Sequence, residues 1–222
     1  MNLVSQYLEN SYEIKAKTLN TLVIEDTEHF TNFLRTLIEV SNKESEEIEL
    51  IDDYKKIDIS KTTDIIFDLF NIEANAATIL KKLYTELEED LCSEDMYIKK
   101  LEMESAIANI VDELRYRSRF SLKSDEINYQ NFFKALSVEF DYEKTSILER
   151  LTEYIKVSSE LLNKKLFIIV NLDSFLTEED LVELNKFLCY NEIKLLALQN
   201  KITREVKTCE HLRIIDQDLC EI

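Results

Sequence analysis

Neither glycine nor proline occurs anywhere in the 222 residues of the chain. Average usage of about 7% and 5% would supply on the order of 15 glycines and 11 prolines at this length. Walker-type phosphate loops, dinucleotide fingerprints and nucleophile elbows all require glycine, so the sequence excludes them. Turns must use other residues that tolerate a left-handed backbone, and Asn163, Asn191 and Asn200 stand where helices or strands are expected to stop.

Both ends of the chain alternate short apolar segments with helical patterns, which is typical of an α/β fold. LNTLVI (19–24) predicts a buried strand, and Asp26 then caps a helix. Further strands are expected over 46–51, 63–69 and 212–215. Residues 164–198 predict strand, loop, helix and strand, with a capping box at Thr177 and Asp180. LFIIV within that span lacks alternation, as a strand buried on both faces should.

Between these two regions, residues 71–162 carry long helical periodicity and almost no strand pattern. Three apolar stripes, within 77–91, 98–114 and 147–162, are expected to pack mainly against one another. The predicted organisation is therefore a discontinuous α/β head domain, residues 1–70 and 163–222, with an inserted helical leg domain over 71–162.

The chain is strongly acidic, with 45 Asp and Glu residues against 27 Lys and Arg and a formal net charge of -18. Such a charge repels phosphate and anionic membranes on average. No apolar run approaches the ~20 residues that span a bilayer, and no signal peptide is expected. The four cysteines, Cys92, Cys189, Cys209 and Cys220, form no C-x-x-C pair, which favours reduced thiols in a cytoplasmic protein.

Few residues could carry catalysis. His29 and His211 are the two histidines, and we predict a surface or capping role for each. Polar residues at the carboxyl ends of parallel strands could bind a ligand, and these are Glu25, Asp26, Asn171 and Asp173. A triphosphate, however, needs amides and a lysine where this chain has carboxylates, so no nucleotide is expected. The alternative is structural, with Asp26 as an N-cap and Asn171 as a turn residue.

A metal-dependent nuclease is a further alternative, because Asp173 precedes the trio Glu192, Ile193 and Lys194 in a D…E-x-K pattern. In a chain with 32% charged residues such a trio arises readily by chance. We therefore rank a nuclease below a protein without enzymatic activity.

Basic residues gather in one acid-free stretch, residues 114–124. Arginine suits bidentate phosphate contacts, and Tyr116 and Phe120 could anchor the segment. The candidate DNA-binding residues are Arg115, Arg117, Arg119 and Lys123, with Lys134 downstream. The alternative is that these arginines pair with acidic neighbours such as Asp112 and Glu113 on a solvated helix.

Four runs in this order resemble the Csn-two family, the adaptation proteins of type II-A CRISPR systems: TLVIEDTEHFTNFLRTL, TTDIIFDLFNIEANAATILKKLYTELE, SDEINYQNFFKAL and KKLFIIVNLDSFLTEEDLVELNKFL. The resemblance implies a degenerate P-loop-ATPase-like head that has lost nucleotide binding, and an inserted α-helical leg. It also implies a homotetrameric ring that threads double-stranded DNA ends through a basic channel. The ring would support spacer acquisition beside the CRISPR integrase complex and the effector nuclease, without enzymatic activity.

The resemblance further implies calcium, held by acidic side chains near the middle of the leg. Asp125 and Glu126 match the family there, but Ser121, Lys123 and Asn131 stand where close relatives would carry carboxylates. Hard cations take several oxygen ligands, so some calcium sites are expected to be weakened or lost. Lys123 could supply a positive charge in place of an ion.

The main alternative function is an acidic adaptor or DNA mimic that binds protein partners only. A ring with its cations inside and its carboxylates outside would reconcile the net charge with DNA binding, because phosphates would meet a local field.

Overall fold

The computed structural model describes residues 1–141, 146–202 and 210–222. The chain divides into two compact units. The first joins Met1–Ala74 with Glu143–Ile222, and the second is Asn75–Tyr142. We call the first the head unit and the second the helical unit, and describe each by itself.

The centre of the head unit is a five-stranded sheet in the order β6-β7-β8-β3-β9, in which every pair is parallel. Its strands are β3 (Leu19–Ile24), β6 (Thr63–Ile66), β7 (Leu166–Val170), β8 (Lys194–Gln199) and β9 (His211–Ile215). All residues of β3 and β7 are buried. The prediction of a parallel α/β sheet with doubly buried strands is confirmed, including the short strand near the C-terminus.

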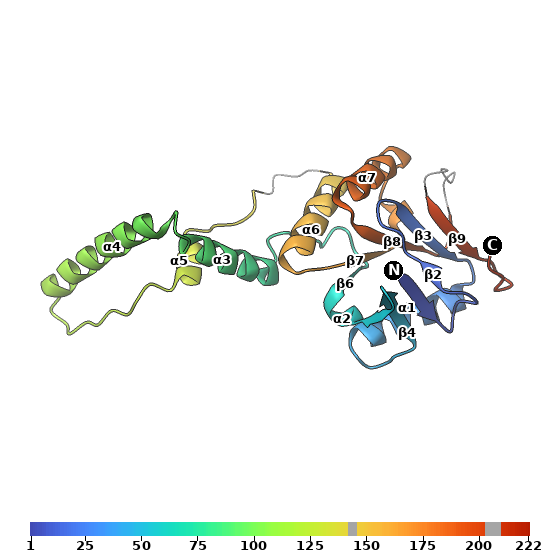
Figure 1. Cartoon of the computed structure of the whole chain (residues 1–222), viewed down its shortest axis with the longest axis horizontal. Helices are drawn as coiled ribbons and strands as arrows, with labels where there is room; N and C mark the ends of the chain where they lie inside the picture. The colour runs from blue at the N-terminus through green and yellow to red at the C-terminus, as the bar shows by residue number, and fades with distance from the viewer. Residues whose placement is uncertain (142–145, 203–209) are drawn as a thin grey trace. The chain divides into compact units, whose positions relative to one another are not determined.

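Helices cover both faces of this sheet (Figure 1). On one face α1 (Thr27–Ser41) packs Phe30, Phe33 and Leu37 into a core with alternate residues of β7 and β8. The other face buries residues of α6 (Ile147–Leu161) and α7 (Glu178–Asn191). A short 3-10 helix, η1 (Leu172–Ser174), leads from β7 toward α7, which begins at the predicted Thr177–Asp180 capping box.

A second, antiparallel sheet extends the head unit in the order β2-β1-β4-β5. Its strands are β1 (Asn2–Ser5), β2 (Tyr12–Glu13), β4 (Ile48–Asp52) and β5 (Lys55–Ile57), and the short helix α2 (Ile59–Thr62) leads from β5 into β6. The sequence predicts β4 but not the other three strands, since two to four residues give too short a pattern to recognise. It also gives no sign that β4 belongs to a separate sheet.

Two buried polar residues connect the strands of the head unit. Asn20 is fully buried; its side-chain amide donates to the carbonyls of Lys15 and Leu195, both at 2.9 Å, and its oxygen accepts from the Lys15 amide at 2.8 Å. The hydroxyl of buried Tyr12 donates to the carbonyl of His211 at 2.7 Å. Each partner removes the cost of burying a polar group.

The helical unit contains α3 (Ala77–Leu91), α4 (Tyr97–Arg117) and α5 (Tyr129–Ala135). Helix α3 contacts α5, where the Tyr84 and Phe133 rings lie 6.2 Å apart. Tyr84 also donates to the carbonyl of Val138 at 2.9 Å. Helix α4, all of whose residues are described, has no buried residue.

The apolar stripes differ from the sequence prediction in two ways. The stripe of α6 does not belong to the helical unit, because Leu148, Leu151 and Ile155 pack with the sheet; the predicted boundary at residue 162 therefore differs from the boundary near residue 142. The stripe of α4 was expected to pack within the leg, yet Ile98, Ile110 and most of its other members are exposed. Periodicity identified the helices but not the surfaces that they cover.

Left-handed turns are built without glycine. Within the described residues nine positions have positive φ, and they are Lys17, Lys43, Asp53, Tyr54, Ser137, Asn163, Asn171, Glu192 and Leu219. Asn163 confirms one predicted stop, whereas α7 ends on Glu192 in the left-handed region, directly after Asn191. Asp53 and Tyr54 form the two-residue loop between β4 and β5, and positive φ at both is the signature of a type I′ hairpin turn.

Among the described residues, no helix combines the length and apolarity needed to cross a bilayer. Cys92, Cys189 and Cys220 are exposed free thiols, and Cys209 lies outside the described residues.

The strain of the glycine-free hairpin can be measured at Tyr54, which is fully exposed. We expect Tyr54→Gly to raise the free energy of unfolding by about 0.5–1 kcal/mol, because glycine adopts positive φ without a Cβ clash. Urea denaturation monitored by circular dichroism would measure the change. In the control Lys55→Gly, at a strand position with ordinary φ, the same measurement should show a loss of about 0.5–1 kcal/mol. A loss of stability in both variants would contradict strain at Tyr54.

Candidate nucleic-acid interface

The basic segment lies where α4 ends and an extended connection toward α5 begins (Figure 1). Arg115 and Arg117 occupy the last turn of α4, where cations interact favourably with the helix dipole. Ser118 leaves the helix with extended geometry, and its hydroxyl accepts from the Phe120 amide at 3.0 Å. The candidate cations Arg115, Arg117, Arg119 and Lys123 are therefore brought together by continuity of the chain, and all are exposed.

Two of the three arginines pair locally, as the sequence alternative proposed. Arg115 contacts Asp112 at 3.0 Å and donates from Nε to the carbonyl of Leu122, and Arg117 pairs with Glu113 one turn earlier. Exposed pairs of this kind contribute only about 0.3–0.5 kcal/mol, so a phosphate can compete for either guanidinium. The Arg115 contact also holds the connection against the end of α4.

Arg119 and Lys123 differ from the other two cations. Within the described part of the chain, neither side chain has an ion pair or hydrogen bond. The predicted anchoring by Tyr116 and Phe120 is wrong, since these side chains are 92% and 72% exposed. Lys134 lies apart from the segment, on the last turn of α5.

The predicted calcium residues, Asp125 and Glu126, follow the basic segment and are exposed. They lie at a cavity of about 570 Å³ between α4 and the connection, which we call the α4 groove. Among the described residues, no three His, Cys, Asp or Glu side chains are grouped as a metal site. Two neighbouring carboxylates fall short of the six to eight oxygens that calcium takes, so these two residues alone do not fit the ion.

At the carboxyl edge of the parallel sheet, three of the four candidate ligand residues, Asp26, Asn171 and Asp173, have structural roles. Asp26 caps α1 and accepts from the His29 amide at 2.7 Å, so its carboxylate occupies the helix terminus that a phosphate would use. Asn171 has φ 54° and ψ 42° in the turn after β7. Asp173 accepts from Gln199 of β8 at 3.1 Å. The structural alternative is confirmed for Asp26 and Asn171.

The D…E-x-K trio does not converge. Asp173 follows the carboxyl end of β7, whereas Glu192 precedes the amino end of β8, and the parallel register aligns Leu166 with Lys194. Residues at opposite ends of a five-residue strand lie roughly 15 Å apart, too far for one metal ion. Glu192 instead pairs with Lys17 at 2.7 Å, which lowers the pKa of the glutamate.

Both histidines take part in structural contacts. The Nε2 atom of His29 lies 3.0 Å from the carbonyl oxygen of Tyr7. His211 stacks on Tyr12 with ring centroids 5.1 Å apart, and burial is the main cause that lowers its pKa. Neither arrangement contains a nucleophile for the imidazole to activate.

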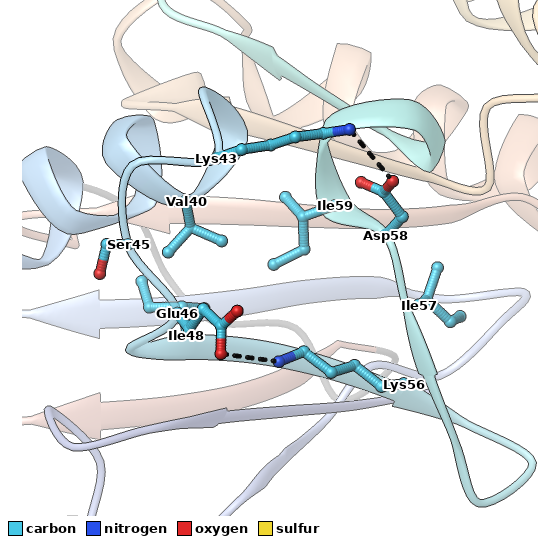
Figure 2. Close-up of a pocket in the computed structure, with 9 residues that line it drawn as sticks. All are labelled: Val40, Lys43, Ser45, Glu46, Ile48, Lys56, Ile57, Asp58 and Ile59. Atoms are coloured by element: carbon cyan, nitrogen blue, oxygen red, sulfur yellow. Dashed lines mark ion pairs between the residues drawn. The ribbon is translucent and has the colours of Figure 1, made fainter.

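Figure 2 shows a pocket in the head unit that the sequence did not reveal. It has a cavity volume of about 430 Å³ and an apolar floor of Val40, Ile48, Ile57 and Ile59. Two ion pairs lie at its rim, Lys43 with Asp58 at 3.6 Å and Lys56 with Glu46 at 3.9 Å. Its residues come from α1, the loop after it, β4, β5 and α2, so no single sequence motif marks it. Because the pocket has two cations and two anions, its charge favours neither a positive nor a negative ligand.

Several known proteins are similar to this chain. Its sequence is 24% identical over 198 residues to the CRISPR-associated protein Csn2 of Enterococcus faecalis, which covers 89% of each chain. Among solved structures, a nucleotide-free ATP-binding cassette from an ABC transporter matches 95% of this chain and 81% of its own, with 12% identity and a TM-score of 0.44. A putative ABC transporter ATP-binding protein from Pyrococcus furiosus matches 92% and 88%, with 10% identity and a TM-score of 0.42.

The family of this chain follows from how much of its sequence a family model matches. The family model described as CRISPR-associated protein (Cas_Csn2) matches residues 41–219, which runs from the end of α1 to the residues after β9. This span includes the helical unit and most of the parallel sheet. The chain therefore belongs to the Cas_Csn2 family of CRISPR-associated proteins.

Proposed function

We propose that this protein binds the ends of double-stranded DNA during CRISPR spacer acquisition in the cytoplasm, without an enzymatic activity of its own. The observation that carries the proposal is a pair of exposed cations, Arg119 and Lys123, which have no partner among the described residues and lie in a stretch free of acidic residues. Membership of a CRISPR-associated family supports a role in adaptation.

The proposed assembly is a homotetrameric ring whose inner surface carries these cations. With a net charge of -18, an isolated chain repels DNA on average. A ring would gather several copies of Arg119 and Lys123 around one duplex and leave the carboxylates outside. Backbone contacts of this kind are independent of DNA sequence and sensitive to salt.

We further propose that the head unit is a degenerate relative of P-loop ATPases and that the helical unit is an inserted leg. The discontinuity of the head unit, which resumes after the helical unit, supports an insertion. The capping of α1 by Asp26 supports loss of nucleotide binding, because the helix terminus that would cradle phosphate carries a carboxylate. In this assignment the protein handles DNA for the integrase complex and the effector nuclease.

Binding to linear and covalently closed circular DNA of the same sequence tests the proposal. In a gel-shift titration with 100 mM salt, we expect the linear duplex to be shifted and the closed circle to remain free, since a ring threads only a free end. Equal binding to both forms would rule out threading. Binding to neither would favour an adaptor that contacts proteins only, and degradation with magnesium would reveal a nuclease.

The cations can be tested by the double variant Arg119→Ala/Lys123→Ala. Its affinity for linear DNA should fall by at least about tenfold, and the plot of log affinity against log salt should become less steep by about 0.9 for each phosphate contact that is lost. The matched control is Lys81→Ala/Lys82→Ala, which removes the same charge from exposed positions on α3. Equal losses in both variants would show that only total charge matters.

We propose that calcium binds at Asp125 and Glu126 only with oxygen ligands beyond these two side chains, and that the positive charge of the nearby Lys123 weakens this binding. Isothermal titration calorimetry should detect tighter calcium binding in Lys123→Glu. The substitution adds the oxygen ligands of a carboxylate and removes the positive charge of the lysine. Tight binding by the unchanged protein that Lys123→Glu does not alter would contradict this role of Lys123.

A further inference from the structure

The α4 groove has an aliphatic wall whose residues are half-buried or exposed. Ile107, Ala108 and Val111 form the wall on α4, and Ile127 faces it from the connection to α5. Figure 1 shows this connection running back beside α4. The volume of about 570 Å³ falls within the about 300–1,000 Å³ typical of ligand pockets.

One end of the groove is a closed polar cluster. Lys100 pairs with Glu104 at 3.9 Å, and its ammonium lies 5.2 Å from the centroid of the Tyr129 ring. The Tyr129 hydroxyl donates to the Glu104 carboxylate; burial of Tyr129 and this hydrogen bond both raise the pKa of the phenol. Lys100 and Glu104 thus neutralise each other and contribute no free charge.

The carboxylates at the other side of the groove are not neutralised. Within the described residues, the side chains of Asp125 and Glu126 have no hydrogen bond or ion pair, and both are exposed. The groove therefore combines an aliphatic wall with two free negative charges. These charges would repel phosphates and anionic lipids. A ligand with a positive group next to an apolar group would pair with the carboxylates and pack on the aliphatic wall.

We propose that the α4 groove binds a short cationic segment of a partner protein, in which arginine or lysine alternates with aliphatic residues. The aliphatic side chains pack on Ile107, Ala108 and Val111, and the cations pair with Asp125 and Glu126. This interaction is separate from DNA binding, because the charge that it requires is opposite to that of Arg119 and Lys123. The same helical unit would then present one surface to nucleic acid and another to protein.

A labelled synthetic hexapeptide of alternating leucine and arginine is the probe, titrated by fluorescence anisotropy with 150 mM NaCl and EDTA so that no calcium takes part. We expect saturable binding to the full chain. In Asp125→Asn/Glu126→Gln the affinity should fall by about fivefold to tenfold, the loss expected for two exposed ion pairs. Ala108→Trp should fill the groove and reduce affinity further, while thermal unfolding stays unchanged.

The matched control is Glu94→Gln/Asp95→Asn, which removes the same two charges from an exposed turn before α4. Its affinity should remain within twofold of the unchanged protein. The proposal is overturned if this control loses as much affinity as Asp125→Asn/Glu126→Gln, or if a serine–arginine hexapeptide binds as tightly as the leucine–arginine one. If Ala108→Trp lowers the unfolding temperature, the comparison of Asp125→Asn/Glu126→Gln with its control Glu94→Gln/Asp95→Asn tests peptide binding in its place. DNA binding by the peptide-deficient variants should persist, which separates this proposal from the proposed function.

Discussion

Burial of both faces of the parallel sheet is the constraint on which the head unit depends. Residues of β7 alternate between two cores, with Leu166, Ile168 and Val170 on one side and Phe167 and Ile169 on the other. A central strand such as β7 must therefore be apolar along its whole length, and a helix must lie against each face. The chain meets this requirement with residues far apart in sequence, since α1 comes before the helical unit and α6 and α7 come after it.

The parts of the fold that could be predicted are those with a strong local signal. A run such as LFIIV or a cap such as Asp26 shows its role within a few residues, so the parallel strands and their helices were identified. The antiparallel sheet could not be, because β2 and β5 have two and three residues. Nor does periodicity tell whether an apolar stripe meets a sheet, as in α6, or stays exposed, as in α4.

For the candidate site, the sequence predicted the charges and offered local pairing with Asp112 and Glu113 as an alternative, but not which arginines would pair. Sequence identified the acid-free stretch, but ion pairing depends on helical spacing and on where the helix ends. Arg115 and Arg117 remain on α4 and find Asp112 and Glu113, while Arg119, beyond Ser118, does not. The α4 groove escaped prediction because its wall and its carboxylates lie on two segments whose approach no local pattern encodes.

The buried Asn20 has a consequence for the alignment of the strands. Its side-chain amide donates to the carbonyl of Leu195 in β8 and to the carbonyl of Lys15, which precedes β3, and the Leu195 contact belongs to the observed register of β3 against β8. A slip by one residue would turn the Asn20 side chain to the opposite face of the sheet and break its hydrogen bond to Leu195, which costs free energy for a buried amide. β3 and β8 are otherwise mostly aliphatic, so this one asparagine helps to fix how the two strands are aligned.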